Sequence, residues 1–310
     1  MEEKTNTDNH EYFLTPDDLI PAFEPFTQLS QSVGWGLIQA GIPEIHKSNK
    51  GSGIKIAVLD TGGTDHQELS GNLIDVFDCT GHNDAADRQG HGTHVAGIIA
   101  AKDNDFGVLG VAPDAQIYCM KVLDNNGRGG YNTIEAGIKK AIELGVDIIN
   151  MSLGAPSKPP ESFHQVIKEA RDKGIFLVAA AGNDGHAVNW PASYDEVIAI
   201  GAIDENGNLT DFSSRGSEIC VIAPGDNIYS TWLNNGYAVL RGTSQASPFV
   251  TGIIALILST HRADPSMKQI VTLSDLFEEL NKLCDPKGRL CDGKDGNFGF
   301  GIPKFPINKC

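Results

Sequence analysis

The alternation of apolar and polar positions along the chain predicts the fold class. From residue 53 onwards, short apolar runs alternate with longer segments whose apolar residues recur at helical spacing. The short runs predict strands at residues 54–59, 115–122, 146–151, 175–180, 197–202 and 219–222. The longer segments predict helices at residues 91–101, 133–144, 162–173 and 243–260. Together they indicate an α/β fold with a doubly wound, mostly parallel β-sheet and helices on both faces.

The predicted strands also indicate where a functional site lies. Two of them, DIINMSL and GIFLVAAA, are almost continuous apolar runs, as expected when helices cover both faces of a sheet. In such a sheet the functional crevice lies outside the carboxyl ends of the strands. Three segments are therefore expected around one crevice, namely Asp60, residues 152–154 and residues 181–183.

The first 30 residues follow neither pattern. They are polar and acidic, they contain Pro16, Pro21 and Pro25, and their one short apolar stretch covers residues 19–23. We therefore expect an N-terminal extension over residues 1–30 and a main domain over residues 31–310.

Size and charge narrow the class of protein. The chain has 310 residues, enough for a sizeable core, and a formal net charge of −16. This acidity argues against a nucleic-acid partner, since phosphate binding needs a positive surface. The N-terminus shows no basic and apolar leader, and no apolar run reaches the length of a membrane span. We therefore predict a cytoplasmic protein with no nucleic-acid and no membrane partner.

The six cysteines leave one alternative open. Those at positions 79, 119 and 220 lie in apolar or mixed segments and are predicted to be buried or free thiols. The other three, Cys284, Cys291 and Cys310, have no CxxC spacing or histidine partner, which argues against a metal site. Their pairing does not follow from the sequence, and in a reducing compartment free thiols are favoured over a disulfide.

Ser244 is the candidate nucleophile. It lies in GTSQASP at the start of a predicted apolar helix, where backbone N–H groups and the helix dipole favour developing negative charge. The alternative role is a helix N-cap. Because a hydroxyl is a poor nucleophile at neutral pH, Ser244 needs a neighbouring base.

His91 and Asp60 are the candidate base and its orienting acid. His91, in GHGTHVAG, would take the proton from Ser244 and pass it to the leaving amine. His94 is expected to be structural, because no HExxH pattern supports a metal pair. Asp60 ends a strand in VLDTG, where its carboxylate can accept from the imidazole and stabilise the imidazolium. The alternative, an aspartic-protease motif, needs a paired carboxylate, and the sequence contains no second DTG or DSG.

Asn183, in AAAGNDG, is the candidate oxyanion donor. Its side-chain amide can donate to a tetrahedral oxyanion together with the backbone N–H of Ser244. The alternative is a turn-forming Asn-Asp-Gly.

These segments share a chain order of Asp, His, Asn and Ser with a known family. IAVLDTG, GHGTHVAGIIA, INMSLG, VAAAGNDG and GTSQASPFVTG resemble the subtilisin-like serine proteases, peptidase family S8, between residues 31 and 303. In style they are closest to the bacterial intracellular subtilisins. The resemblance implies a doubly wound parallel sheet and a serine endopeptidase that acts through an acyl-enzyme.

The resemblance also implies the substrate site. Two strand-like edges would hold a protein or peptide substrate by main-chain hydrogen bonds, and they match Gly127, Arg128, Gly129 on one side and Ser152, Leu153, Gly154 on the other. The pocket for the P1 side chain would be walled by residues 152–155 and 180–183, including Ala181 and Gly182, with Asn189 at its floor. Because Asn189 is neutral, we expect broad specificity with large uncharged P1 residues. A cis Trp190–Pro191 bond is implied as well.

A calcium site follows from the same resemblance. The ligands implied are the side chains of Gln31, Glu68 and Asn104 and the carbonyls of Lys102, Phe106 and Val108. Oxygen-only ligation suits Ca²⁺. Among its departures from the family pattern are Glu68 for Asp, Gln245 for Met and Phe249 for His; the last two are expected to alter packing or specificity.

The extension resembles that of intracellular subtilisins, which carry a Leu-Ile-Pro-aromatic motif. Here the motif reads Leu19, Ile20, Pro21, Ala22, Phe23. We expect residues 1–30 to lie across the cleft and inhibit a zymogen, since proline near the scissile bond resists cleavage. The alternatives are a narrow-specificity processing protease and a catalytically silent subtilisin-fold binding protein. The family also suggests a homodimer.

Overall fold

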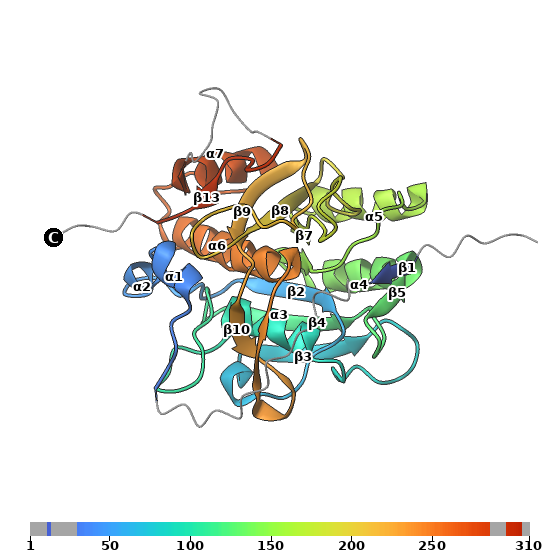
Figure 1. The fold of residues 1–310 in the computed structure, drawn as a ribbon, viewed down its shortest axis with the longest axis horizontal. Coiled ribbons are helices and arrows are strands. Elements are labelled where there is room, and N and C mark those ends of the chain that lie inside the picture. Colours follow the sequence, from blue (N-terminus) through green and yellow to red (C-terminus); the bar gives the residue numbers. More distant parts are fainter. Residues whose placement is uncertain (1–10, 14–29, 286–295, 306–310) are drawn as a thin grey trace, which may run out of the picture.

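A seven-stranded parallel sheet forms the centre of the molecule (Figure 1). The computed structural model describes residues 11–13, 30–285 and 296–305. The strands lie in the order β3 (Leu73–Asp78), β4 (Gln116–Lys121), β2 (Lys55–Asp60), β6 (Ile148–Met151), β7 (Phe176–Ala180), β8 (Val197–Ile203) and β9 (Ile219–Pro224). This arrangement confirms the predicted doubly wound α/β fold.

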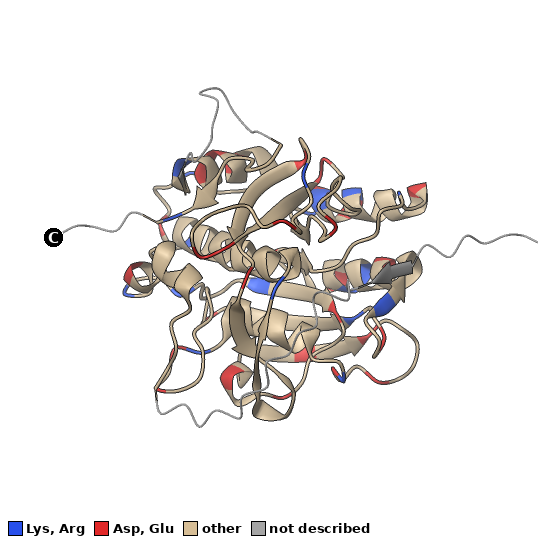
Figure 2. Ribbon diagram, in the orientation of Figure 1, with Lys and Arg blue, Asp and Glu red and all other residues tan. Residues whose placement is uncertain are grey.

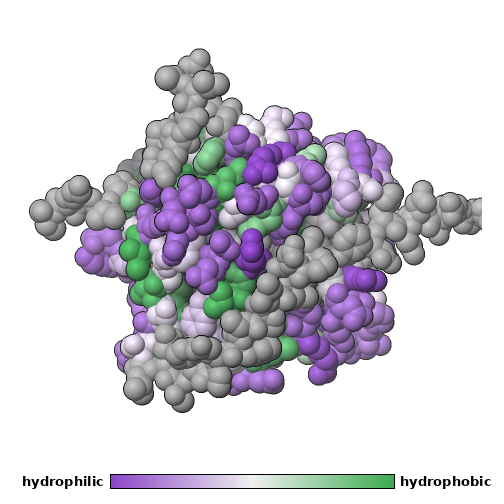
Figure 3. Space-filling model, in the orientation of Figure 1, coloured by the Kyte–Doolittle hydropathy of each residue, from purple (hydrophilic) through white to green (hydrophobic). Residues whose placement is uncertain are grey.

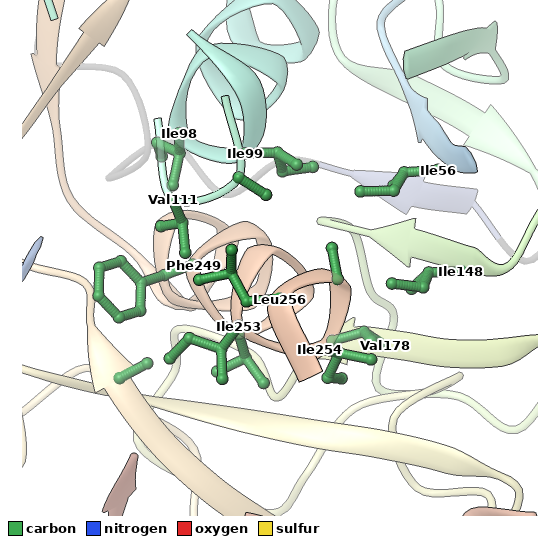
Figure 4. Packing of buried hydrophobic residues seen from close by; sticks show 14 of the residues in the cluster. Ile56, Ile98, Ile99, Val111, Ile148, Val178, Phe249, Ile253, Ile254 and Leu256 are labelled. Atoms are coloured by element: carbon green, nitrogen blue, oxygen red, sulfur yellow. The ribbon is translucent and has the colours of Figure 1, made fainter. Parts of the chain in front are cut away.

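Helices cover both faces of this sheet, as predicted. They are α3 (His91–Ala100) and α6 (Thr243–Ala263) on one face, and α4 (Tyr131–Leu144) and α5 (Glu161–Asp172) on the other. Successive residues of β2 enter opposite cores, with Ile56 on the α3–α6 side and Ala57 on the α4–α5 side. Figure 4 shows the first core, where Ile254 of α6 packs close to Val178 of the sheet.

The middle strands end at one edge of the sheet. Leu59 of β2 is paired with Met151 of β6, and Met151 is paired with Ala179 of β7. The residues that follow these three strands therefore emerge side by side. The register confirms that Asp60 and the segments after β6 and β7 share one edge, as the apolar runs predicted.

Smaller elements surround the sheet. They are the helices α1 (Trp35–Gln39), α2 (Ile42–Ile45) and α7 (Leu273–Leu283), the 3₁₀ turns η2 (Gln67–Leu69) and η3 (Leu233–Asn235), the hairpin β10 (Ile228–Thr231) with β11 (Tyr237–Leu240), and the pair β12 (Cys284–Asp285) with β13 (Ile302–Pro303). The hairpin packs against α3. The sequence pattern predicted none of these smaller elements, and it also missed the edge strand β3.

The predicted extension contributes one described strand. β1 (Glu11–Phe13) pairs antiparallel with β5 (Arg128–Gly130), with Glu11 opposite Gly130 and Phe13 opposite Arg128. The predicted motif residues Leu19, Ile20 and Pro21 lie outside the described residues. The extension therefore meets the domain at one of the two edges expected to hold substrate.

Polar and charged groups dominate the exterior. Figure 2 places Lys, Arg, Asp and Glu mainly in loops and on helices, and hydrophilic residues predominate on the face shown in Figure 3. Helix α6 is long and apolar enough to cross a membrane, but 89% of its most apolar window is buried inside the protein. Its apolar character is that of a core helix.

Candidate active site

A buried Asp–His pair lies at the carboxyl edge of the sheet. Nδ1 of His91 is 2.8 Å from Oδ1 and 3.0 Å from Oδ2 of Asp60, and the Thr61 N–H donates to Oδ1 at 2.7 Å. A carboxylate only accepts, so the imidazole must carry its proton on Nδ1. In the neutral ring the lone pair is then on Nε2.

Two glycines let α3 begin close to Asp60. A Cβ on Gly92 would lie 2.3 Å from the Gly62 carbonyl, and one on Gly90 would lie 2.5 Å from the ring of Trp232. Gly90 also has a φ of 106°, which larger residues rarely adopt. The two glycines that flank His91 therefore allow the close approach on which the Asp60 contact depends.

His94 is structural, as expected. Its Nε2 faces the carbonyls of Ile228 and Ala238, each at 3.1 Å, and so joins α3 to the β10–β11 hairpin. Burial, with a smaller contribution from neighbouring His91, lowers the pKa of His94 to about 3. The ring is therefore neutral at physiological pH.

Ser244 is the second residue of α6 and is tied to the end of β6. Its Oγ donates to the Ser152 carbonyl at 3.2 Å, and the Ser152 Oγ donates to the Ser244 carbonyl at 2.8 Å. The N-cap of α6 is Gly242, which excludes the alternative N-cap role for Ser244. The first N–H groups of a helix have no intrahelical acceptor, so this position surrounds the hydroxyl with donors.

Asn183 is held beside Ser244 by Thr243. Oδ1 of Asn183 accepts from the Thr243 N–H at 2.8 Å and from the Thr243 Oγ1 at 2.7 Å, and the Gly182 N–H donates to that hydroxyl at 3.1 Å. These bonds identify which end of the amide is oxygen. The group that Asn183 can offer to an anion is therefore Nδ2.

The residues predicted for the P1 pocket come together. A Cβ on Gly154 would lie 3.2 Å from Cβ of Asn189, and a Cβ on Gly182 would lie 2.5 Å from its Nδ2. The Asn189 N–H donates to the Ala181 carbonyl at 2.8 Å. Segments after β6 and β7 thus meet around Asn189, and both glycines keep space open next to its side chain. Ser152 and Leu153 precede Gly154 on the same segment.

The neighbouring turn and edge strand complete the region that the sequence predicts to hold substrate. Residues 155 and 190 form an antiparallel bridge, and the Trp190–Pro191 bond is cis, as predicted. Gly127 has a φ of 72° and closes the turn before β5, which contains Arg128 and Gly129. Every substrate residue expected from the sequence therefore lies in a segment that the structure describes.

The predicted calcium ligands also gather in one cluster. Nε2 of Gln31 lies 2.5 Å from the Lys102 carbonyl and 3.1 Å from the Val108 carbonyl. The buried Glu68 accepts from Nδ2 of Asn104 at 2.9 Å and from the Val108 N–H at 2.8 Å. Phe106 joins the same loop, since its N–H donates to Oδ1 of Asn104 at 3.0 Å.

The cluster fits a hard cation by its chemistry. Tyr237 donates to Glu68 at 3.0 Å, but among the described residues Glu68 forms no ion pair, and burial raises its pKa. A buried carboxylate without a positive partner is costly, and a bound cation would compensate it. The described residues contain no group of three or more His, Cys, Asp or Glu that could hold a metal. The candidate ligands are instead side-chain amides, backbone carbonyls and one carboxylate, a set that suits Ca²⁺.

Several residues that build the site were missed from the sequence. Asn150 is buried, donates to the Ser152 Oγ at 3.0 Å, and accepts from Ser247 at 2.8 Å and Thr251 at 2.9 Å, which joins β6 to α6. Asn150 lies in the INMSLG motif, whose position at a strand end was the available signal. Thr243 lies beside the nucleophile candidate, but only the structure reveals its contact with Asn183.

Comparisons with known proteins place the chain in a family. The subtilase family model matches residues 51–277. Subtilisin DY of Bacillus licheniformis is 47% identical over 220 residues, which cover 68% of this chain and 79% of that protein. Subtilisin BL of Lederbergia lenta is 43% identical over 230 residues, 74% of this chain and 85% of the relative. The minor extracellular protease Epr of Bacillus subtilis is 39% identical over 275 residues, 87% of this chain but 41% of the relative.

These relatives overturn the predicted location. The Bacillus subtilis relative is by name an extracellular protease, and the similarity of the chain to such bacterial proteases contradicts the cytoplasmic assignment. That prediction was wrong because it depended on the absence of a leader. A secretory leader is removed from a mature chain, so its absence carries no information on location.

The match and the geometry concern the same part of the chain. Asp60, His91, Asn183 and Ser244 all fall within residues 51–277, the range of the family model. That range is well over half of the chain, and the relatives confirm it at 39–47% identity. The chain therefore belongs to the subtilase family and is a subtilisin-like serine endopeptidase.

Proposed function

We propose that this chain hydrolyses peptide bonds with Ser244 as nucleophile, His91 as base and Asp60 as the acid that orients it. Nε2 of His91 takes the proton of Ser244 as Oγ attacks the scissile carbonyl, and then delivers it to the leaving amine. Water then attacks the acyl-enzyme: Nε2 of His91 takes a proton from the water and returns it to Oγ of Ser244 as the ester bond breaks. The observation that carries this proposal is the 2.8 Å contact between Nδ1 of His91 and Asp60, which sets the tautomer that the base needs.

The proposed oxyanion donors are Nδ2 of Asn183 and the backbone N–H of Ser244. Thr243 supports this role, because it binds Oδ1 of Asn183 and so turns the donor end away from itself. Donors that are fixed before the reaction stabilise the developing charge without reorganisation. The main-chain edges 127–129 and 152–154 would hold the substrate on either side.

Labelling and cleavage test the proposal together. A fluorophosphonate probe should label wild type at Ser244 and leave Ser244→Ala unlabelled. Cleavage of a succinyl-Ala-Ala-Pro-Phe chromogenic peptide should follow the same pattern. Labelling without cleavage of this peptide or of a peptide library would favour a dedicated substrate. The absence of both, in the full chain and after removal of residues 1–30, would refute the proposal.

We propose further that the P1 pocket accepts large uncharged side chains. Asn189 carries no charge, and glycines at 154 and 182 leave room beside it. A library that varies only P1 tests this directly. A preference for Lys, Arg, Asp or Glu at P1 would contradict it.

The chain is also proposed to be a zymogen that its N-terminal residues inhibit. β1 pairs with β5, the edge proposed to hold substrate, so both cannot use that edge at once. Asp60 and His91 are fully buried and Ser244 is 4% exposed, so a substrate can reach them only if residues around them move. Both observations support a closed site in the full chain.

Proline variants test this inhibition. Tyr12→Pro and Phe13→Pro are both needed, because adjacent N–H groups of a strand point in opposite directions. At least one should raise the initial activity of the full chain, whereas Tyr12→Ala, which keeps the N–H, should raise it less. Mass spectrometry should show the N-terminus shortened over time in wild type and intact in Ser244→Ala. Equal initial activity in all variants would contradict the zymogen.

We propose that Ca²⁺ is held by the side chains of Gln31, Glu68 and Asn104 and the carbonyls of Lys102, Phe106 and Val108. When bound, the ion would supply the positive charge that buried Glu68 lacks and would fix the loop after α3. It takes no part in peptide hydrolysis. Removal of calcium by a chelator should lower the melting temperature, and an unchanged melting temperature would refute the site.

A further inference from the structure

A second buried carboxylate lies four residues before His91. Asp87 is 4% exposed. Its Oδ1 accepts from the Thr61 Oγ1 at 2.9 Å and from the N–H groups of residues 89 and 90 at 3.0 and 2.8 Å. Its Oδ2 accepts from the Thr93 N–H at 2.9 Å and the Thr93 Oγ1 at 2.7 Å. All five donors belong to the residue after Asp60 or to residues 89–93, which lead into α3 and form its start.

Thr61 connects this carboxylate to the Asp–His pair. Its N–H donates to Asp60, and its hydroxyl donates to Asp87 while accepting from the Gly92 N–H at 2.9 Å. A hydroxyl has one proton and two lone pairs, so these two bonds are compatible. One short path therefore runs from Asp87 through Thr61 to Asp60, and a second runs from Asp87 along the backbone of α3 to His91.

Lys121 holds the backbone next to both Thr61 and Asp87. The side chain is buried, and Nζ donates to the carbonyls of Thr61 at 2.8 Å and Ala86 at 3.2 Å and to Oδ1 of Asn125 at 2.9 Å. Burial lowers the pKa of Lys121, while the nearby Asp87 carboxylate favours its charged form. One ammonium thus holds the peptide units next to both Thr61 and Asp87.

We propose that Asp87 is a positioning residue that sets the distance between Asp60 and His91. The role rests on the proposed triad, and Asp87 itself does not contact the reacting atoms. An amide at this position would present N–H groups to donors that now meet an oxygen, and buried donors without an acceptor are costly. The first turn of α3 would shift to relieve this, and His91 would move with it. A misplacement of about 1 Å near a reacting centre can cost about a hundredfold in rate.

The test uses Asp87→Asn in the full chain with two independent measurements. Proton NMR should show a low-field resonance for the Nδ1 proton of His91 in wild type, and in the variant this resonance should shift or broaden. Once activity has reached a constant level, kcat per titrated active site should fall by about tenfold or more, with KM within about twofold. Thr61→Val, which removes the hydroxyl, should show both changes. Thr61→Ser, which keeps the hydroxyl, should show neither.

Asp275→Asn is the matched control for a purely structural role. Asp275 also accepts from a threonine N–H and hydroxyl at the start of a helix, at 2.9 and 2.7 Å, but it lies at α7. The Asp275→Asn variant should have a lower melting temperature than wild type, with the same kcat and the same His91 resonance.

Three results would overturn the proposal. Asp87→Asn with wild-type kcat and an unchanged resonance would show that Asp87 only stabilises the fold. If that variant does not fold, Thr61→Val with wild-type kcat would show the same. A wild-type chain with neither resonance nor activity would remove the triad itself, which separates failure of the proposed function from failure of the positioning role alone.

Discussion

Two buried carboxylates near the two ends of α3 have opposite surroundings. Asp60, beside the first residue of α3, faces the His91 ring, which can gain a positive charge during a reaction. Glu68, beside the loop that follows α3, accepts from neutral donors, namely Asn104, Val108 and Tyr237. We expect the first environment to face a charge that changes during the reaction, and we propose that the second holds a bound cation. Burial of an acid alone therefore does not indicate a catalytic role. The groups that contact the carboxylate distinguish a catalytic acid from a cation ligand.

The largest expected effect is that of Asp60→Asn. The amide would present N–H groups to Nδ1 of His91 and favour the wrong tautomer, so kcat should fall on the order of 10⁴-fold. Stability should change little, because the amide oxygen can still accept from the Thr61 N–H, and the amide N–H groups can donate to Nδ1 of His91 in its other tautomer. Steady-state kinetics with active-site titration and thermal unfolding measure the two. A variant that keeps more than about a tenth of wild-type kcat would show that the Asp60 and Glu68 environments do not differ as proposed.

Glu68→Gln also replaces a buried carboxylate by an amide, but here we expect a change in stability and none in activity. In calcium the variant should be less stable by about 1–3 kcal/mol, since it loses the charge and one acceptor for its donors. In a chelator this difference should shrink, because wild type then buries an uncompensated charge. Activity per folded molecule should be unchanged. Asp264→Asn, an exposed acid that accepts from Ser266 at 2.9 Å, should show no calcium-dependent difference.

The pH dependence of the calcium-free chain sharpens the comparison further. Burial raises the pKa of Glu68 above its ordinary value of 4.5, so the folded state binds this proton more tightly than the unfolded state. The contribution of Glu68 to stability is then full below about pH 4.5 and is lost as pH rises through the folded pKa. Calcium should remove this loss, as it favours the charged form. The test is the wild-type minus Glu68→Gln difference in unfolding free energy, measured across pH with and without chelator. A difference independent of pH and calcium would contradict the site.

The sequence predicted the parts of the fold and site that leave a local signal. Buried strands read as apolar runs, and Asp60 ends one of them, so its position at the crevice was predictable. Strand β3 was missed because it lies at the sheet edge and carries Asp75 and Asp78 among its apolar residues. Helix α7 was missed although Thr272 and Asp275 form a capping box at its start.

Contacts between residues that are far apart in the sequence could not be predicted from local sequence patterns. Thr243 lies 60 positions from Asn183, and Thr61 lies 26 positions from Asp87, so only the folded chain brings their hydrogen bonds together. The proposed triad could be named from the sequence because each of its members lies in a short motif of its own. Its supporting residues are spread between those motifs.

The smallest expected effect is that of Gln245→Met. Gln245 directly follows Ser244 and is fully buried, and neither atom of its amide has a hydrogen-bond partner among the described residues. Unlike the acceptors of Asp60 and Glu68, this polar group is uncompensated, so an apolar side chain of similar size should raise the free energy of unfolding by about 1–2 kcal/mol. Gln269→Met is the control, since the exposed Gln269 already donates to the His261 carbonyl at 2.7 Å and should yield no gain. A Gln245→Met variant that is less stable than wild type would mean that the amide binds a buried water.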